Sequence, residues 1–192
     1  MTKHRRGVQP FRKSERDDDI RSPRLLLRLM GRDVLRATVE SNLDRVESLL
    51  GLHVPEEWLA LQWLAAMRLE QERRDPAFRS WSIRAVALAE TLEMVGYLNC
   101  HAPPHDGSIE LGYEIFPGFR RKGFAEEAVR TFLNHTTAPG GIAVVRLSIR
   151  PDNEASQAMA RKLGARKVGT HIDEVDGLED IYLLDAAPLG LR

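Results

Sequence analysis

The chain has 192 residues, 43% of them hydrophobic, which is enough for one sizeable core. Lys and Arg total 28 and Asp and Glu total 28, so the formal net charge is zero. This balance argues against nucleic acid or an anionic membrane as the main partner. A single cysteine, Cys100, excludes an intrachain disulfide and favours a reducing compartment. No apolar run approaches the roughly 18 residues of a membrane-spanning helix, and the N-terminus is charged, so we expect a soluble, cytoplasmic protein.

Three segments are expected along the chain. Residues 1–22 are dominated by charge and predict a flexible tail. Its basic start, with Lys3, Arg5 and Arg6, is compatible with an RNA contact, but a solvated arm is the favoured interpretation. Residues 23–185 form the single domain, and residues 186–192 form a short C-terminal tail.

In the first half of the domain, the spacing of apolar residues is first that of a strand, then that of helices, and then that of strands again. Alternation over Leu25 to Leu29 predicts a strand, and helical spacing then follows from Val34 and again from Leu43. A third helix is expected to open at Pro55-Glu56-Glu57 and to end near Pro76. The period then becomes two, which predicts strands over 81–89, 94–98 and 109–115.

The second half alternates between strand and helix. Apolar residues from Ala125 to Leu133 lie on one helix face, residues 145–149 predict a strand, and a helix over 155–163 ends at Gly164. Segments 167–172 and 180–184 predict a last hairpin. The fold class is therefore α/β (α+β): a mixed, mainly antiparallel central sheet flanked by helices, with one strand–helix–strand crossover.

The segment from Tyr113 to Ala125 predicts an anion site between a strand and a helix. The first N–H groups of a helix have no partner within it and lie at the positive end of its dipole. Gly123 and Ala125 leave room for phosphate oxygens, and Arg120, Arg121 and Lys122 add positive charge. The segment lacks the P-loop and dinucleotide-binding patterns. The alternative is an ordinary strand–helix turn with incidental basic residues.

The pattern Arg120-x-x-Gly123-x-Ala125, after a strand and before an amphipathic helix, resembles the cofactor loop of GNAT N-acetyltransferases. The resemblance implies acetyl-CoA as cosubstrate, with coenzyme A as product. Its pyrophosphate would be bound by the main-chain amides from Arg121 through Phe124 to Ala125, with Arg120 and Lys122 as supporting charges. A main-chain amide near Ile115 would polarise the thioester carbonyl.

Two further segments carry the resemblance. Asn153-Glu-Ala-Ser156, followed by Lys162-Leu-Gly164, is similar to the family's next motif, which implies Asn153 beside the pantetheine arm and Ser156 near the sulfur. The alternative is that Asp152 or Asn153 only caps the helix, and both roles are compatible. Pro23 to Arg28, Trp81 and Val95 to Tyr97 resemble the branch that acetylates the N-termini of ribosomal proteins. The likeness spans residues 23–185.

The sequence departs from the family at the proton donor and leaves the base open. Many members carry a tyrosine where this chain has Ala160, so Ser156 is the expected donor. Glu110 is the first choice for the base, with Glu114 on the same strand face; both are also compatible with plain solvated positions. At pH 7, a lysine-like amine needs about 4.6 kcal/mol to lose its proton, but an α-amine needs only about 1.1 kcal/mol. This difference favours an α-amine acceptor.

The expected function is transfer of an acetyl group from acetyl-CoA to a primary amine, including a protein N-terminal α-amine. Two alternatives stay open: an acceptor that is a polyamine, aminoglycoside or amino-acid derivative, and a non-catalytic protein that binds acyl-CoA. Cys100, His101 and His105 have metal-binding side chains but match no standard zinc spacing, so no metal is expected. Whether the protein forms a homodimer also stays open.

Overall fold

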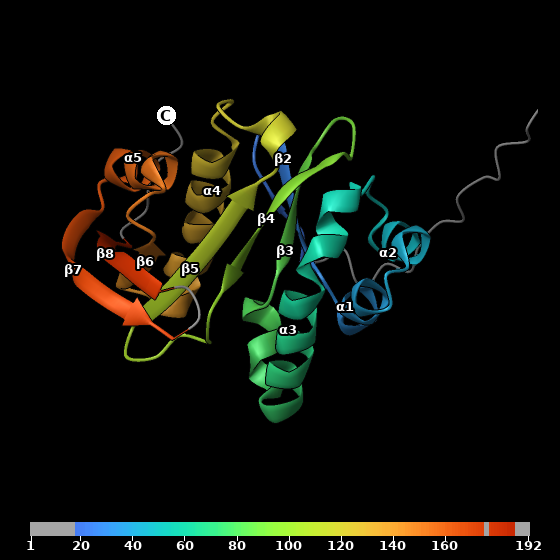
Figure 1. Cartoon of the computed structure of the whole chain (residues 1–192), viewed down its shortest axis with the longest axis horizontal. Coiled ribbons are helices and arrows are strands. Elements are labelled where there is room, and N and C mark those ends of the chain that lie inside the picture. Colours follow the sequence, from blue (N-terminus) through green and yellow to red (C-terminus); the bar gives the residue numbers. More distant parts are fainter. Residues whose placement is uncertain (1–17, 175–176, 187–192) are drawn as a thin grey trace, which may run out of the picture.

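The computed structural model describes residues 18–174 and 177–186 (Figure 1), and the side chains of residues 137–140 are not among those described. The predicted tails thus lie mostly outside the described residues. Within them, strands form one sheet in the order β1-β2-β3-β4-β5-β6-β8-β7. The strands are β1 (Ile20–Arg21), β2 (Leu25–Leu29), β3 (Arg84–Leu88), β4 (Met94–Cys100), β5 (Ser108–Ile115), β6 (Val144–Ile149), β7 (Arg166–Asp173) and β8 (Gly177–Asp185).

The α-helices are α1 (Arg32–Val39), α2 (Leu43–Leu50), α3 (Gln62–Arg74), α4 (Phe124–Gly140) and α5 (Glu154–Leu163). Three 3₁₀ helices join them: η1 (Glu56–Leu61), η2 (Pro76–Trp81) and η3 (Pro117–Phe119). Among the described residues, no helix combines the length and the apolar character needed to cross a membrane.

The sheet is antiparallel at every described pairing except β5 with β6, which are parallel. Helix α4 is the crossover between these two strands, as parallel neighbours require. This arrangement confirms the predicted fold class, including its single strand–helix–strand unit.

Helices cover both faces of the sheet, and each face has its own hydrophobic core (Figure 1). On one face, α4 and α5 contribute Val129, Phe132 and Leu163 to a core with β4, β5 and β6. On the other face, α1, α2 and α3 pack on β2, β3 and β4 around Trp58. Strands buried on both faces lose the alternation of a half-exposed strand. This explains why Leu25, Leu26 and Leu27 are all buried.

Two predicted elements differ from the structure near α3. The helix expected from Pro55 begins as η1 and becomes α-helical only at Gln62. The strand expected from residue 81 starts at Arg84, because Trp81 closes η2. Pro76 opens η2, and the Asp75 side chain caps it by accepting a hydrogen bond from the Ala77 N–H. Such a local cap favours a helical turn over an extended strand. The short strand β1 was not predicted at all.

Candidate active site

The site begins where β5 and β6 stop pairing. In the described part of the chain, the two strands pair only over Ser108–Glu110 and Val144–Arg146. Beyond Arg146, β6 continues to pair with β8, while β5 continues with β4 alone. The sheet therefore opens along the second half of β5.

Main-chain groups of β5 face this opening. Residues of an antiparallel pair alternate between hydrogen-bonded and non-hydrogen-bonded positions. The Phe116 N–H donates to the Val95 carbonyl, and the His101 N–H donates to the Glu110 carbonyl. The even-numbered residues of β5 thus bond to β4, and the N–H and C=O groups of Tyr113 and Ile115 point away from β4, toward β6. The predicted Ile115 amide therefore faces the opening.

The predicted cofactor loop lies directly after β5 and η3. Arg121 and Gly123 both adopt left-handed backbone conformations, with φ values of +64° and +79°. Gly123 is the N-cap of α4, and no side chain caps this helix end by a hydrogen bond. Phe124 is buried and anchors the helix start, while Arg120 to Gly123 are exposed. The loop thus presents uncapped helix N–H groups to solvent, which is the geometry of an anion site.

The basic side chains of the loop are placed differently from one another. The Arg120 Nε donates to the Ile115 carbonyl at 2.8 Å, and its Nη2 lies 3.6 Å from Glu114 Oε1. Arg120 therefore fastens the loop to the end of β5. The Lys122 ammonium lies 5.3 Å from the centre of the Phe119 ring.

Helix α5 brings Ser156 close to Tyr113. Asn153 is its N-cap, and Asn153 Oδ1 accepts a hydrogen bond from the Ser156 N–H at 3.1 Å. The Tyr113 hydroxyl is buried and, among the described residues, has no hydrogen-bond partner of good geometry. Burial raises the pKa of this phenol, and the nearby Ser156 hydroxyl partly opposes the rise. Ala160, which leaves no hydroxyl at this position of α5, is fully buried. Tyr113 was not predicted as a site residue.

The opposite face of the opening carries the two predicted base candidates. The Glu110 carboxylate accepts a hydrogen bond from the Ser148 hydroxyl at 2.5 Å. It also lies 3.5 Å from His101 Nδ1 and 3.6 Å from Arg146 Nε, and the glutamate side chain is 26% exposed. Glu114 accepts a hydrogen bond from the Tyr97 hydroxyl at 3.2 Å. Both glutamates are therefore paired, and neither is the plainly solvated position left open by the sequence.

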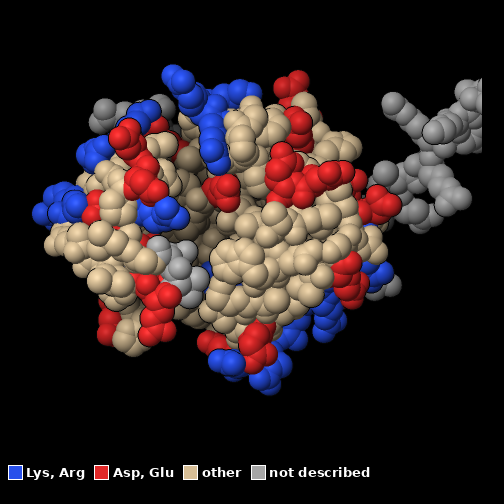
Figure 2. Space-filling view, viewed as in Figure 1, with Lys and Arg blue, Asp and Glu red and all other residues tan. Residues whose placement is uncertain are grey.

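Gly112 lies between these two glutamates on the same face of β5. A Cβ on Gly112 would lie 3.1 Å from His101 Nε2 and 3.3 Å from Asn99 Oδ1, so both side chains sit close above its main chain. Figure 2 shows a hollow on this face of the molecule, between the part formed by α1–α3 and the part formed by β6–β8 and α5. The hollow lies over β5.

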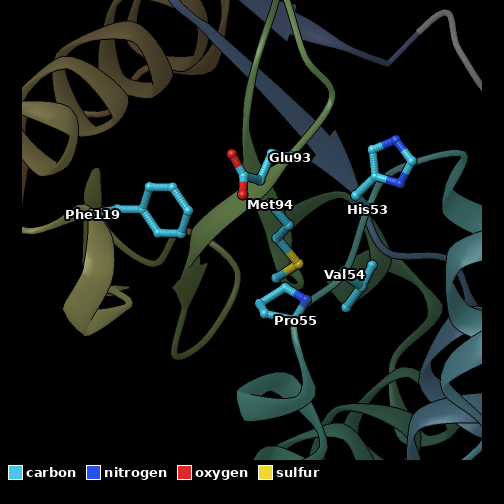
Figure 3. A pocket seen from close by; sticks show the side chains of 6 residues that line it. All are labelled: His53, Val54, Pro55, Glu93, Met94 and Phe119. Carbon is cyan, nitrogen blue, oxygen red and sulfur yellow. The ribbon is translucent and has the colours of Figure 1, made fainter.

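A small pocket lies at the start of β4, beside η3 (Figure 3). Its volume is about 160 Å³, and its lining residues are His53, Val54, Pro55, Glu93, Met94 and Phe119. Sites for cofactor-sized ligands usually measure about 300–1,000 Å³. The pocket is therefore too small for a coenzyme.

The metal-binding side chains singled out in the sequence do not converge. Across residues 18–174 and 177–186, no group of three or more His, Cys, Asp or Glu side chains has the placement to hold a metal ion. Cys100 is buried, and His105 is exposed beside Asp106. His101 instead joins the Glu110 cluster.

Comparisons with known proteins identify the family of the chain. A family model described as an acetyltransferase (GNAT) domain matches residues 24–166. An uncharacterized N-acetyltransferase of Bacillus subtilis (strain 168), YoaA, is 32% identical over 81 residues, which cover 42% of this chain and 46% of that protein. The aligned region thus spans less than half of the curated relative.

Two solved structures share the fold at low sequence identity. An acetyltransferase from Salmonella typhimurium that modifies the N-terminal serine of ribosomal protein L7/L12 has a TM-score of 0.59 and 18% identity, covering 85% of this chain and 96% of its own. The microcin C7 self-immunity acetyltransferase MccE, in complex with acetyl-CoA and AMP, has a TM-score of 0.60 and 12% identity, covering 85% and 93%. Together with the family match over residues 24–166, these findings show that the chain belongs to the GNAT acetyltransferase family.

Proposed function

We propose that the protein transfers an acetyl group from acetyl-CoA to a primary amine, and that the amine is a protein N-terminal α-amine. The observation that carries the proposal is the opening beside β5. It has uncapped N–H groups of α4 at one end and a paired carboxylate at the other, and between them the N–H groups of Tyr113 and Ile115 point away from β4.

The residues of the loop suit a pyrophosphate. The amides from Arg121 to Ala125 would bind the phosphate oxygens. Gly123 has φ = +79°, a conformation that glycine adopts without strain, and a Cβ at this position would lie 3.5 Å from Arg24 Nη2. Arg120 contributes by fixing the loop on the Ile115 carbonyl, with Lys122 as additional charge. Asn153 caps α5 beside the predicted path of the pantetheine arm.

Acetyl-CoA would supply a thioester, whose acyl carbon is open to attack by an amine. The Ile115 N–H would donate to the thioester oxygen as negative charge develops on it, a contribution typical of acyl-transfer sites. Glu110 would accept the proton of the amine, directly or through a water molecule. Ser156 would donate a proton to the departing sulfur. The buried Tyr113 hydroxyl lies close to the Ser156 hydroxyl.

The energetics of the acceptor favour an α-amine. An α-amine at pH 7 needs about 1.1 kcal/mol to become neutral, against about 4.6 kcal/mol for a lysine side chain. Ser148, Arg146 and His101 hold the Glu110 carboxylate at the edge of the opening, where it could accept a proton from an acceptor amine. A structural neighbour acts on an N-terminal serine, which adds support for this acceptor class.

A panel of amines tests the proposal. Release of free thiol from acetyl-CoA is followed with a peptide that has a free N-terminus, the same peptide with its N-terminus blocked and a lysine present, a polyamine and an aminoglycoside. We expect release with the free N-terminus and little with the blocked peptide. If only the polyamine or the aminoglycoside is acetylated, the acceptor is a small molecule and not a protein N-terminus. If acetyl-CoA binds but no amine is acetylated, the protein is not a catalyst.

A further inference from the structure

Arg24, between β1 and β2, contacts the cofactor loop although it is about a hundred residues away in the sequence. Its Nη1 donates to the Lys122 carbonyl at 3.2 Å. Its guanidinium carbon lies 5.0 Å from the centre of the Phe124 ring, and its Nη2 would lie 3.5 Å from a Cβ on Gly123. One side chain thus touches three consecutive residues of the loop.

Glu127, in the first two turns of α4, fixes Arg24 in this position. Its carboxylate accepts hydrogen bonds from the Arg24 Nε at 2.6 Å, the Arg24 main-chain N–H at 3.1 Å and the Ser22 hydroxyl at 2.6 Å. The Arg24 Nη2 lies 2.5 Å from Glu127 Oε2, the same oxygen that accepts from Nε, so both guanidinium nitrogens share one charged acceptor. The Glu127 side chain is only 11% exposed, against 52% for Arg24, so the carboxylate is the fixed partner.

The bond to Lys122 sets the direction of one loop amide. The Lys122 C=O and the Gly123 N–H belong to the same trans peptide plane and point in opposite directions. Because Arg24 holds the carbonyl on its own side, the Gly123 N–H must point away from Arg24. Arg121, directly before Lys122, has a left-handed conformation with φ = +64°, and such a conformation in a residue other than glycine persists only where the surroundings enforce it.

We propose that the Arg24–Glu127 pair positions the cofactor loop, so that its amides face the pyrophosphate of coenzyme A before binding. Arg24 is a positioning residue in this proposal, not a phosphate ligand. The inference rests on the proposed function of the loop and gives a role to Arg24, which lies in the segment Pro23–Arg28 and to which the sequence assigned none. A loop that is already held in place loses less conformational entropy when coenzyme A binds, which is the usual gain from preorganisation.

Calorimetry with acetyl-CoA, together with steady-state kinetics, tests this role in Arg24→Gln. We expect about tenfold weaker affinity and a matching rise in KM, the effect of losing one charge-assisted contact, with kcat at saturation within about twofold of wild type. Glu127→Gln should weaken affinity in the same direction. Arg24→Lys should recover only part of the loss, because one ammonium cannot replace a guanidinium that reaches both Glu127 and Lys122.

Arg28→Gln, in the strand β2 that follows Arg24, is the matched control. Arg28 is buried, lies 2.7 Å from Asp19 and donates to the Leu50 carbonyl, away from the loop. The Arg28→Gln substitution should lower the free energy of unfolding without changing the affinity for acetyl-CoA. Wild-type affinity in folded Arg24→Gln, or equal losses in the Arg24 and Arg28 variants, would overturn the positioning role alone. If the wild-type protein does not bind acetyl-CoA, both the proposed function and this inference fail.

Discussion

Replacing Glu110 by Gln removes one negative charge from the hollow over β5 and preserves the shape of the side chain. Gln keeps a carbonyl oxygen to accept the Ser148 hydrogen bond, now 2.5 Å long. It gives up the charge that faces His101 and Arg146, and it cannot take a proton from an amine. The substitution therefore isolates the proton-accepting role from the packing of the site.

The size of the effect follows from the acceptor equilibrium. A positioned general base usually contributes about 10²–10⁴-fold. An α-amine at pH 7 is only about 1.1 kcal/mol from its neutral form, so we expect the lower end of this range, about 10²-fold in kcat/KM. At pH 6 the same equilibrium costs about 2.4 kcal/mol, and near pH 9 it costs nothing. The ratio of the wild-type kcat/KM to that of Glu110→Gln should therefore fall by up to about 50-fold between pH 6 and pH 9.

The assay is kcat/KM for the amine, measured by thiol release across this pH range at saturating acetyl-CoA. Glu114→Gln is the matched control, because Glu114 lies on the same face of β5, two residues past Gly112, and bonds to Tyr97 instead of Ser148. It should change kcat/KM less and leave the pH profile in place. If both variants keep the wild-type profile, the proton goes to water or to a group outside β5, and the assignment of Glu110 is wrong.

Three other tests address the cofactor loop, the proton donor and the buried Cys100. Gly123→Glu should abolish acetyl-CoA binding, measured by calorimetry. Gly123→Ala adds only the strain of about 1–2 kcal/mol that a side chain has at φ = +79°, so it should weaken binding less. A folded Gly123→Glu variant with the affinity of the wild type would refute the cofactor site. Ser156→Ala should lower kcat more than it weakens cofactor binding, and wild-type kcat would remove this hydroxyl from the mechanism. Burial raises the pKa of Cys100 to about 12, so iodoacetamide at pH 8 should modify the unfolded but not the native protein. Because this pKa exceeds the unfolded value near 8.5, the thiol should also lower the free energy of unfolding above about pH 8.5.

The fold was predictable because its strongest signals are local. The helix face from Ala125 to Leu133, the glycine end at Gly164 and the period-two segments all reappear as α4, the αL cap of α5 and the strands. The turn from β5 into α4 was predictable for the same reason, since a strand, a basic loop and a glycine stand next to one another in the chain. Where the prediction shifted, at η1 and η2, a proline and a capping aspartate decided the local conformation.

The surroundings of each site residue were not predictable, because they come from distant segments. Ser148 and His101 reach Glu110 only through the register of β4, β5 and β6. Arg24 reaches the cofactor loop only because β2 lies against α4. Alternation along β5 was the one signal that separated Glu110 and Glu114 from Tyr113, and it places Tyr113 on the α4–α5 face, where the sequence alone gave it no partner.

The alternation of β5 also divides the proposed reaction between two faces of the sheet. Even-numbered side chains, including Glu110, lie on the face of α1–α3, and odd-numbered ones, including Tyr113, lie on the face of α4–α5. The amine would thus lose its proton on one face, and the sulfur would gain a proton near Ser156 on the other. The main chain at Ile115 faces the opening between them, where the acyl group would pass. Because β5 has no neighbour on one side beyond Glu110, its two faces and its main chain would all be available to one reaction. This explains why the opening in the sheet, rather than any single side chain, defines the site.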